Sequence, residues 1–458
     1  MKANIYDIVI IGSGISGLSL GHFISKADKD FSQVILEKKS RVGGAIRTFR
    51  QDGFLAEYGP HGFLDNIEES RELLEDYKDS LRIQKASLNS FVRYLCLDGK
   101  LNLIPQSPPK IIRSPILPVS AKLRVLSDLW KAPLQGEPSV SEWVEYRFGK
   151  RILPFADAVL TGTYAGDFEK LSIDAVMPAL RRMEFEAGSV LKGVIRQKKQ
   201  SKKASDGLPS MVSFQGGIEE LTQCMGEKLA PLTGHPVTSL KRQGNEWEIK
   251  TTQKTFYAKT AVVALNINQA LELLKSLEPP PVMAVPEARI ANILLGFDAS
   301  AEIPFGFGYL APRGEKRFTL GSLFSTHMFP GRAPAQTQMI EVLVGGILYP
   351  ERVNLDDEEL VSKALEDVGQ LIKLPKPPVF KRVIRSDIGI PQLEIGHKRL
   401  TDYKERLENN HPGLSILGFG WNGIGMNDMI RESKKLAGKI LDGKKLSDTP
   451  EKAKGIYF

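Results

Sequence analysis

The sequence predicts an α/β plus α+β fold, in which a Rossmann-like dinucleotide-binding domain is combined with a mixed-sheet domain and a helical domain. The chain has 458 residues, which is more than one hydrophobic core usually supports, so we expect two or three packed domains. A short apolar strand, a glycine-rich turn and a helix open the chain, and a second strand, glycine loop and helix lie near its end. These two units predict a nucleotide-binding domain assembled from separate segments.

The composition is that of an ordinary folded protein. Apolar residues make up 42% and charged residues 25% of the chain, and the formal net charge is +8. The two cysteines, Cys96 and Cys224, form no CxxC or metal-ligand spacing, so we expect no disulfide scaffold, no metal site and a reducing compartment. No run of 18 or more apolar residues occurs, and any membrane contact is therefore expected to be peripheral.

The first glycine-rich turn has the spacing of a dinucleotide-binding loop. Residues 6–11 form a short apolar run, and Gly12, Gly14 and Gly17 follow it directly and open a helix expected over residues 15–25. In this pattern Gly12 permits a tight turn, Gly14 lets the backbone approach a pyrophosphate, and Gly17 lets the helix pack on the strand. The start of the helix then faces the phosphates.

An acidic residue follows the second predicted strand. This strand, residues 33–36, ends in Glu37, which has roughly the 20-residue spacing at which an acid binds a ribose hydroxyl. The acid favours an adenosine ribose without a 2′-phosphate.

Two further glycine-rich elements come soon after, Arg41-Val-Gly43-Gly44 and Glu57-Tyr-Gly59-Pro60-His61-Gly62. At this point the sequence resembles the flavin amine oxidase and protoporphyrinogen oxidase superfamily, in which an RxGG and an ExGP element extend the FAD site beyond the first βαβ unit. The resemblance implies FAD as the cofactor, and an NAD dehydrogenase would not need these elements. Val237, which opens a predicted strand, matches the position whose backbone holds the adenine in that superfamily.

The second glycine loop near the end of the chain resembles the closing motif of the same superfamily. Residues 414–417 are typical of a buried strand, and the loop after them leads into a helix for which Asn427 or Asp428 is the expected N-cap and Gly443 the expected end. The resemblance implies that residues around Ile424-Gly425-Met426 touch the flavin. Met429 stands where many relatives carry cysteine.

The resemblance assigns cofactor binding to these loops and their neighbours. The expected FAD-binding residues are Gly12, Ser13, Gly14, Ile15, Ser16, Gly17, Glu37, Lys38, Arg41, Gly43, Gly44, Gly59, Pro60, His61, Gly62, Val237, Trp421, Ile424, Gly425 and Met426.

Segments in the middle of the chain resemble the protoporphyrinogen oxidases in particular, so that the likeness covers roughly residues 5 to 445. It implies that Arg93 pairs with a propionate, that the Gly162 carbonyl accepts from pyrrole N–H groups, and that Leu310, Leu323 and Leu343 line flat apolar walls. These residue types suit a tetrapyrrole, which is a broad apolar disc with acids along one edge. At Leu343 some relatives carry an aromatic residue.

The expected reaction is the six-electron oxidation of protoporphyrinogen IX to protoporphyrin IX in heme biosynthesis, with dioxygen as the acceptor. No catalytic side chain is assigned, because flavin N5 itself accepts hydride, and His61 is expected to contribute its backbone rather than acid–base chemistry. The alternatives are oxidation of coproporphyrinogen III by an enzyme of the same fold, a flavin amine oxidase, and a non-catalytic FAD-binding module. The missing C-terminal cysteine for flavin attachment disfavours an amine oxidase.

A stretch over residues 104–131 mixes apolar residues, prolines and bases. We expect it to contact an anionic membrane surface, with Lys122, Arg124 and Lys131 at the headgroups and Leu123, Leu126 and Trp130 dipping inward. This places the protein in the cytoplasm, on the inner face of the cytoplasmic membrane. The lysines near residues 196–205 have no nucleic-acid recognition motif around them, so no nucleic-acid partner is expected. A homodimer is compatible with the sequence.

Three domains are expected from these assignments. The FAD-binding domain should comprise residues 1–87, 206–285 and 396–458, the helical and membrane-associated domain residues 88–205, and the substrate-binding domain residues 286–395. The active site should lie where the three meet.

Overall fold

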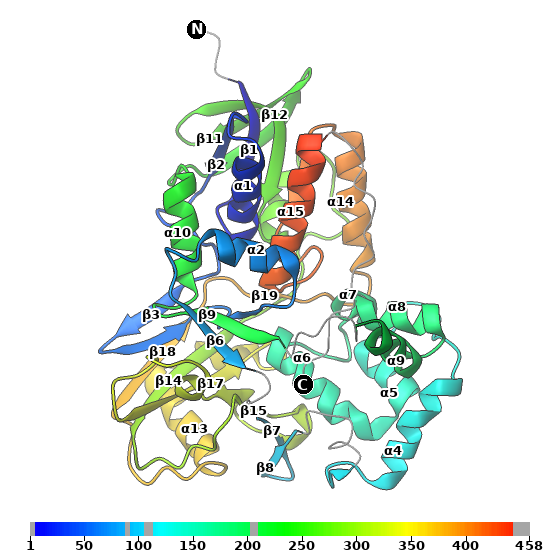
Figure 1. Ribbon diagram of the computed structural model, residues 1–458, viewed down its shortest axis with the longest axis vertical. Helices are drawn as coiled ribbons and strands as arrows, with labels where there is room; N and C mark the ends of the chain where they lie inside the picture. The colour runs from blue at the N-terminus through cyan, green and yellow to red at the C-terminus, as the bar shows by residue number, and fades with distance from the viewer. Residues whose placement is uncertain (1–4, 88–91, 105–112, 202–208, 443–458) are drawn as a thin grey trace.

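The computed structural model describes residues 5–87, 92–104, 113–201 and 209–442. Gly443, residues 105–112 of the expected membrane segment and most of the lysine-rich stretch after residue 201 lie outside these ranges. The molecule is elongated, with a sheet and its helices at one end of the long axis and a second sheet beside a helical bundle at the other (Figure 1). The described part of the chain is thus a mixed α/β structure.

A six-stranded sheet carries the predicted dinucleotide-binding unit. Its central strand β1 pairs in parallel with β2 on one side and β12 on the other, and β12 also pairs in parallel with β20. An antiparallel connection through β11 and β10 extends the sheet beyond β12. The bounds are β1 Ile5–Ile11, β2 Gln33–Leu36, β10 Val237–Gln243, β11 Glu246–Thr251, β12 Thr255–Ala264 and β20 Leu414–Leu417.

Helices cover both faces of this sheet because successive side chains of the buried strands point to opposite sides. Ile8 and Ile10 of β1 pack with the first group of helices, and Val9 and Ile11 pack with the second. The first group is α1 Ile15–Ala27, α2 Glu68–Asp76, α10 Glu219–Leu229 and α15 Met426–Asp442, and the second is α11 Ile267–Leu274 and α14 Lys398–Asn410. Helix α15, from the end of the chain, lies beside α1, from its beginning (Figure 1).

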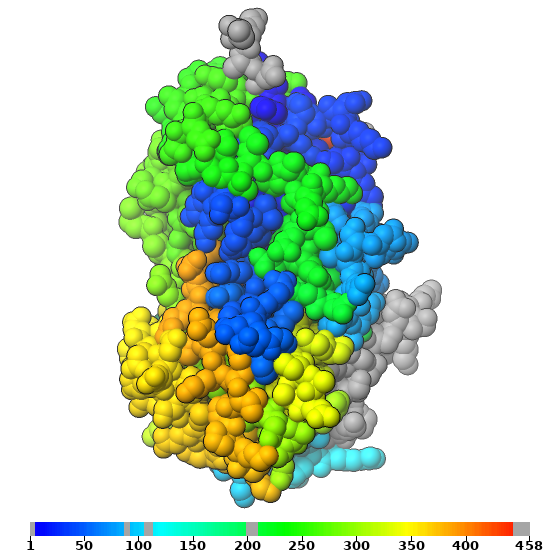
Figure 2. Space-filling model, turned by 90° about the vertical axis from the view of Figure 1, so that its left-hand side faces the viewer, coloured from blue at the N-terminus to red at the C-terminus, as the bar shows by residue number. Residues whose placement is uncertain are grey.

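A seven-stranded sheet forms the other end of the molecule, in the order β18-β14-β17-β16-β15-β7-β8. Helix α13 Asp357–Gly369 packs on one of its faces. The strands are β7 Arg93–Leu97, β8 Lys100–Leu103, β14 Ile290–Asp298, β15 Gly308–Leu310, β16 Gly321–Leu323, β17 Thr337–Gly345 and β18 Phe380–Arg385. In the side view, the segments of the two sheets occupy opposite ends of the surface (Figure 2).

One boundary differs from the expectation. The helical segment was predicted to begin at residue 88, yet Arg93–Leu97 and Lys100–Leu103 are strands of the seven-stranded sheet. β7 pairs in parallel with β15, more than 200 residues away in sequence, and its Cys96 side chain enters the core under α13. The burial of this short segment depends on that distant partner, which local sequence does not reveal.

The helices beside the seven-stranded sheet form a bundle around Trp143, Leu160 and Leu171 (Figure 1). Helix α5 begins with a capping box between Ser139 and Glu142, which satisfies two backbone N–H groups. The elements are α4 Val119–Leu126, η1 Ser127–Trp130, α5 Val140–Phe148, η2 Lys150–Ile152, α6 Leu153–Tyr164, α7 Ile173–Val176, α8 Pro178–Ala187 and α9 Val190–Ser201.

Charged side chains are buried inside this bundle. The fully buried guanidinium of Arg147 contacts Asp128 at 2.9 Å and Glu184 at 2.6 Å, and Arg181 lies 2.5 Å from the other oxygen of Glu184. The indole N–H of Trp143 and the backbone N–H of Leu134 also donate to Glu184. Each carboxylate is thus paired and hydrogen-bonded, as burial of a charge requires.

Short elements join these bodies. The shortest of them pair as β3 with β4, as β5 and β6 with β9, and as β13 with β19. Their bounds are β3 Thr48–Gln51, β4 Phe54–Glu57, β5 Phe63–Leu64, β6 Ile83–Ser87, β9 Ser210–Phe214, β13 Glu287–Ala288, β19 Ile390–Pro391, η3 Arg313–Glu315, α12 Ser325–Met328 and η4 Pro350–Asn354.

Candidate active site

The first glycine loop accepts only glycine at two positions. Gly12 has a φ of +107°, and a β-carbon there would lie 2.6 Å from the carbonyl oxygen of Ala264. A β-carbon at Gly17 would collide with the carbonyl oxygen of Gly12. The tight turn and the close approach of helix to strand therefore both depend on the missing side chains, as the spacing predicts.

The loop fits a pyrophosphate. Gly14 is the N-cap of α1 and makes no side-chain cap, so the first N–H groups of the helix remain available to an anion. A β-carbon at Gly14 would meet no protein atom within 4 Å, so this turn borders open space, while Ile15 and Ser16 behind it are buried. Glu37 ends β2 beside the loop, where its carboxylate accepts hydrogen bonds from the backbone N–H of Ser13 at 3.0 Å and from its hydroxyl at 2.8 Å.

The second glycine element packs directly on the first. The backbone N–H of Gly43 donates to the carbonyl of Ser13 at 2.9 Å, and Gly44 lies against Gly14. The guanidinium of Arg41 donates to the carbonyls of Val42, Gly44 and Ile46, at 2.8 to 3.3 Å. Arg41 thus holds the turn itself in shape, a role that its side chain fulfils without a ligand.

Backbone hydrogen bonds join Glu37 to the segment that leads into Val237, where the adenine is expected. Glu37 donates its N–H to the carbonyl of Leu232 at 2.9 Å and accepts from the N–H of His235 at 2.8 Å. These bonds bring the start of β10, at Val237, next to the end of β2. Lys38 is exposed at the same place.

The ExGP element runs from the glycine loops toward the second sheet. Gly59 packs on the carbonyl of Ala45, and Gly62 lies against the backbone of Val212, with Pro60 half-buried between them. The imidazole of His61 points to the seven-stranded sheet, where its Nε2 lies 2.8 Å from a carboxylate oxygen of Glu341. The side chain of His61 therefore takes part in an ion pair, which the expected backbone role did not include.

The C-terminal glycine loop lies across from this element. Helix α15 begins at Met426, so its N-cap position is Gly425, two residues before the predicted Asn427 and three before Asp428. Asp428 still caps the turn by accepting from the N–H of Gly425 at 3.2 Å, and Asn427 instead donates to the carbonyl of Leu64. Asn427 was misassigned because its partner lies 363 residues away in sequence.

The same loop carries a buried donor without a protein partner. Trp421 is 1% exposed, and its indole N–H has no hydrogen-bond acceptor within the described structure. Met426 is buried, whereas Ile424 and Gly425 keep partial exposure. A buried, unsatisfied N–H beside two glycine turns suits a polar ligand.

The expected substrate residues fall on one face of the seven-stranded sheet, in two adjacent rows. In the first row Arg93 lies opposite Gly308, Gly308 opposite Leu323, and Leu323 opposite Glu341. The second row, two residues away on each strand, runs from Leu310 through Gly321 and Leu343 to Asn292. Residues paired in this way share a face.

This face is met by the other parts of the chain. A β-carbon at Gly162 of α6 would lie 2.8 Å from Leu310, so the helical bundle contacts the second row. His61 meets the first row at Glu341. The opposite face, with Tyr309 and Val342, is filled by the core under α13. The structure therefore brings together the candidates Arg93, Gly162, Leu310, Leu323 and Leu343.

Arg93 stands at the end of the first row. Its guanidinium lies 5.0 Å from the ring centre of Phe307, which fixes one side of it by a cation–π contact. The side chain is half-buried, and burial lowers the pKa of Arg93. A partly desolvated guanidinium binds a carboxylate more strongly than one on an open surface.

A buried charge network at the junction was missed by sequence reasoning. Glu341 also accepts hydrogen bonds from Asn292 and Ser325, both at 2.6 Å. Nearby, Glu57 pairs with Arg332 at 2.8 Å. The sequence signal that could have revealed this network is Glu341 itself, a charged residue inside the apolar strand segment from Met339 to Val344, where a buried acid needs partners.

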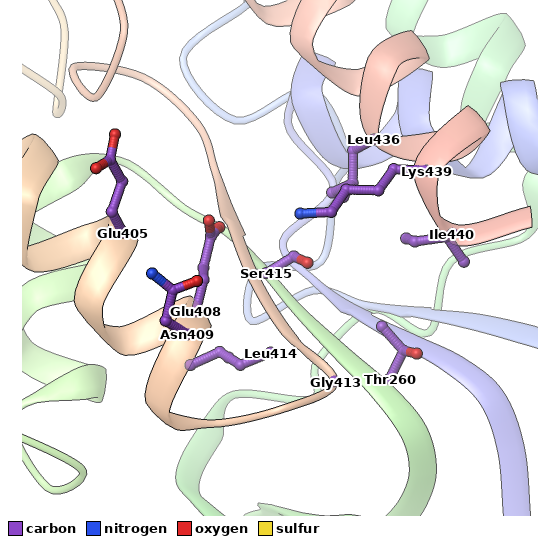
Figure 3. A pocket seen from close by; sticks show the side chains of 10 residues that line it. All are labelled: Thr260, Glu405, Glu408, Asn409, Gly413, Leu414, Ser415, Leu436, Lys439 and Ile440. Carbon is purple, nitrogen blue, oxygen red and sulfur yellow. The ribbon is translucent and has the colours of Figure 1, made fainter. Parts of the chain in front are cut away.

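A separate pocket lies at the other edge of the nucleotide-binding sheet. Figure 3 shows this pocket, of about 470 Å³, between α14, β20 and α15, with Glu405, Glu408 and Lys439 on its wall. It borders Leu414, the first residue of β20, whereas the glycine loops follow the last residues of the parallel strands. Nucleotides bind at the carboxyl edge of such sheets, so this pocket lies away from the candidate site.

Comparisons with known proteins agree with this geometry. A family model for flavin containing amine oxidoreductases matches residues 15–391. The chain is 26% identical over 455 residues to the coproporphyrinogen III oxidase of Bacillus subtilis (strain 168), covering 93% of this chain and 96% of that one. It is 24% identical over 479 residues to protoporphyrinogen oxidase 2, chloroplastic/mitochondrial, of Arabidopsis thaliana, covering 95% and 93%. The crystal structure of a protein from Exiguobacterium sp. 255-15 superposes with a TM-score of 0.79 at 21% identity, covering 96% of this chain and 100% of that one, and so shares the fold.

Proposed function

Because the chain belongs to the family of flavin containing amine oxidoreductases, and is accordingly a flavin-dependent oxidoreductase, we propose that it oxidises a porphyrinogen with bound FAD. One observation carries the proposal: the face that meets the flavin-binding elements carries three leucines in two adjacent rows, and a half-buried arginine stands at the end of the first row. A flat apolar disc with carboxylates at its rim matches such a surface. Relatives named as protoporphyrinogen and coproporphyrinogen oxidases support it.

The residues of this chain have separate tasks in the proposed reaction. Bound FAD would supply the hydride acceptor. Arg93 would hold a propionate, and Leu310, Leu323 and Leu343 would keep the macrocycle flat and exclude water from its centre. The carbonyl of Gly162, on α6, would accept from the pyrrole N–H groups and so fix the rotation of the ring. The cofactor residues named in the sequence analysis would hold the FAD.

We take protoporphyrinogen IX as the first candidate substrate, since Arg93 is the cation in the part of the sheet face that carries the three candidate leucines, and Arg382 lies beyond Glu341 and Leu294 at the far edge. Coproporphyrinogen III is the second, because the B. subtilis relative bears that activity in its name. Porphyrin fluorescence, measured in air with each substrate against a heat-killed blank, tests both. Preference for the tetracarboxylate would move the protein to the second activity, and turnover of neither would refute the proposal. Hydrogen peroxide formed in step with porphyrin would identify dioxygen as the acceptor.

Replacing Arg93 with alanine is expected to raise the KM for the porphyrinogen by about tenfold or more, which corresponds to a loss of about 1.4 kcal/mol in binding. A charge-assisted pair contributes about 1.5–3 kcal/mol, and kcat should change much less than KM. The matched control is Arg382→Ala, an exposed arginine near the opposite edge of the same sheet. Equal KM values for the Arg93→Ala variant and the unmodified protein would remove Arg93 from the site.

We also propose that the helical bundle rests on a membrane surface, through a stripe of exposed apolar side chains. Val119, Leu123, Leu126 and Trp130 follow one another at helical spacing on α4 and η1, and are between 48% and 81% exposed. Within the described ranges, no helix has the length and apolar content needed to cross a bilayer. The contact would therefore be peripheral, and the stripe supplies the apolar area for it.

The bases of this segment have other partners. Arg124 donates to the carbonyls of Glu145, Tyr146 and Arg147 at the end of α5, and Lys131 donates to the Tyr146 carbonyl as well. Lys122 donates to the carbonyl of Ser114. Arg124 and Lys131 thus close the end of α5, and Lys122 binds a carbonyl before α4, so the headgroup role expected from the sequence is not the one that these contacts favour.

A double substitution, Leu123→Glu with Trp130→Glu, is expected to weaken binding to vesicles of mixed neutral and anionic lipid at least tenfold. Burying one large apolar side chain contributes about 1.5–3 kcal/mol, and tenfold corresponds to about 1.4 kcal/mol. Co-sedimentation with the vesicles measures the loss. Val379→Glu, which changes an apolar residue 63% exposed on the far sheet, is the control. Equal sedimentation of both variants would contradict the membrane role of the stripe.

A further inference from the structure

Four charged side chains meet at the junction of the two sheets. They are His61 and Glu57 from the ExGP element, Glu341 from β17, and Arg332 from the segment before β17. Two are cationic and two anionic when His61 is protonated. Burying such a group of charges costs free energy, and charges that are buried at the boundary of a candidate site often have a function there.

His61 is the member of this network that a ligand can reach. Its side chain is 17% exposed, whereas those of Glu341, Glu57 and Arg332 are between 1% and 4% exposed. The carboxylates and the guanidinium are therefore sealed behind the imidazole. A ligand at this junction would meet the positive end of the network first.

The position of His61 in the chain is bracketed by two flavin-binding elements. Two residues before it, Gly59 packs on Ala45 of the second glycine element, which itself lies on the first glycine loop. Three residues after it, Leu64 accepts a hydrogen bond from Asn427 at the start of α15. The segment that carries His61 thus lies between the elements expected to hold the pyrophosphate and the ring of the flavin, and its imidazole points from there to Glu341 of the seven-stranded sheet.

The carboxylates around the imidazole of His61 favour its charged form. Burial alone would lower the pKa of His61, but the carboxylates of Glu341 and Glu57 outweigh burial and the opposing effect of Arg332, so that the pKa is raised above its ordinary 6.5. The charge is therefore kept to higher pH than in a free imidazole, and it is lost as the pH rises through the raised pKa. Glu341 fixes the imidazole in place through a contact of 2.8 Å.

We propose that the His61–Glu341 pair places a fixed imidazolium beside the flavin ring, where it stabilises the negative charge that the ring gains on two-electron reduction. The inference rests on the proposed function only for the identity of the reductant. In each oxidation a C–H bond of the substrate breaks and its hydride carries two electrons to the ring, which becomes one unit more negative, while one further proton leaves the substrate for water. A preorganised cation at the place where charge develops lowers the free energy of that state.

The test uses the FAD-loaded protein without any porphyrinogen, so its outcome is independent of the substrate proposal. Sulfite adds to an electron-poor flavin ring, bleaches its visible band and leaves it negatively charged, so sulfite affinity reports the same electrostatics. His61→Leu is expected to weaken sulfite binding at least tenfold and to lower the two-electron midpoint potential by at least about 30 mV, the equivalent of tenfold. His61→Arg, which keeps a cation, should restore most of both.

The matched control is His22→Leu. His22 is also a buried histidine paired with a carboxylate, Asp76 at 2.9 Å, but it lies on α1 away from the ExGP element. It should leave sulfite affinity and potential unchanged. Equal values for His61→Leu and the unmodified protein would overturn the proposal.

A second measurement follows the pH dependence of sulfite binding. The sulfite affinity of the unmodified protein should fall as the pH rises through the raised pKa of His61, and in Glu341→Gln, which removes the carboxylate partner, this fall should occur at lower pH. A sulfite affinity with the same pH dependence in both proteins would also refute the imidazolium.

Discussion

Replacing Glu184 with alanine is expected to lower the free energy of unfolding by about 3–5 kcal/mol, the usual cost of removing one partner from a buried ion pair. The substitution leaves the guanidiniums of Arg147 and Arg181 without their shared carboxylate, and the indole N–H of Trp143 without its acceptor. Arg147 keeps Asp128, at 2.9 Å. The midpoint of urea unfolding, followed by tryptophan fluorescence, measures the loss.

Glu186→Ala is the matched control, because Glu186 lies on the same helix α8 and is exposed. It should change the free energy of unfolding by less than about 0.5 kcal/mol. A loss of similar size in both variants would show that the buried network contributes nothing beyond helix propensity. Burial raises the pKa of Glu184, but its five donors outweigh burial and the pKa is lowered from the ordinary 4.5. The stabilisation is therefore present above that value and is lost as the pH falls through the lowered one.

Replacing Gly14 with alanine is expected to weaken FAD binding by about a hundredfold, or about 2.8 kcal/mol, while the apoprotein stays folded. The added methyl group meets no protein atom within 4 Å, and the cost of alanine at this N-cap, about 1 kcal/mol, is small beside the packing of the buried helix α1. The methyl group instead occupies the space through which the loop approaches the pyrophosphate. Titration of the apoprotein with FAD, followed by flavin fluorescence, gives the two affinities.

Gly369→Ala is the control for Gly14→Ala, since the added β-carbon also enters open space, here at the end of α13. It should bind FAD as the unmodified protein does. If Gly14→Ala kept full affinity, the pyrophosphate would have to lie elsewhere. Gly17→Ala would be a poor substitute, because its methyl group collides with the carbonyl of Gly12 and would confound binding with misfolding.

The parts of the fold that sequence predicted well are those in which one short segment carries its own geometry. The turn at Gly12 needs a positive φ, and the helix after it needs Gly17 to approach the strand, so the residue types alone specify the loop. Glu37 follows for the same reason, because its place depends on one strand and a fixed spacing. The strands and helices of the structure confirm the predicted mixed α/β character, and the family match confirms the predicted flavin cofactor.

What the sequence did not reveal depends on partners far away along the chain. Glu341 looked like one acid in an apolar strand, and its pairing with His61 spans 280 residues. Arg124 and Lys131 looked like membrane-facing bases, yet carbonyls at the end of α5 bind them. The strand at Arg93 formed because β15 lies beside it. No local pattern contains these contacts, since each is fixed only by the tertiary fold.

The pairing of β20 with β12 has a consequence for the order in which the protein matures. The nucleotide-binding sheet receives its last parallel strand from Leu414–Leu417, and α15 then packs on α1 from the opposite end of the chain. During synthesis, about nine-tenths of the polypeptide must therefore leave the ribosome before this sheet can close. Until then the faces of β12 and α1 that β20 and α15 later cover remain uncovered, and transiently exposed apolar surface of this kind makes a folding chain prone to aggregation.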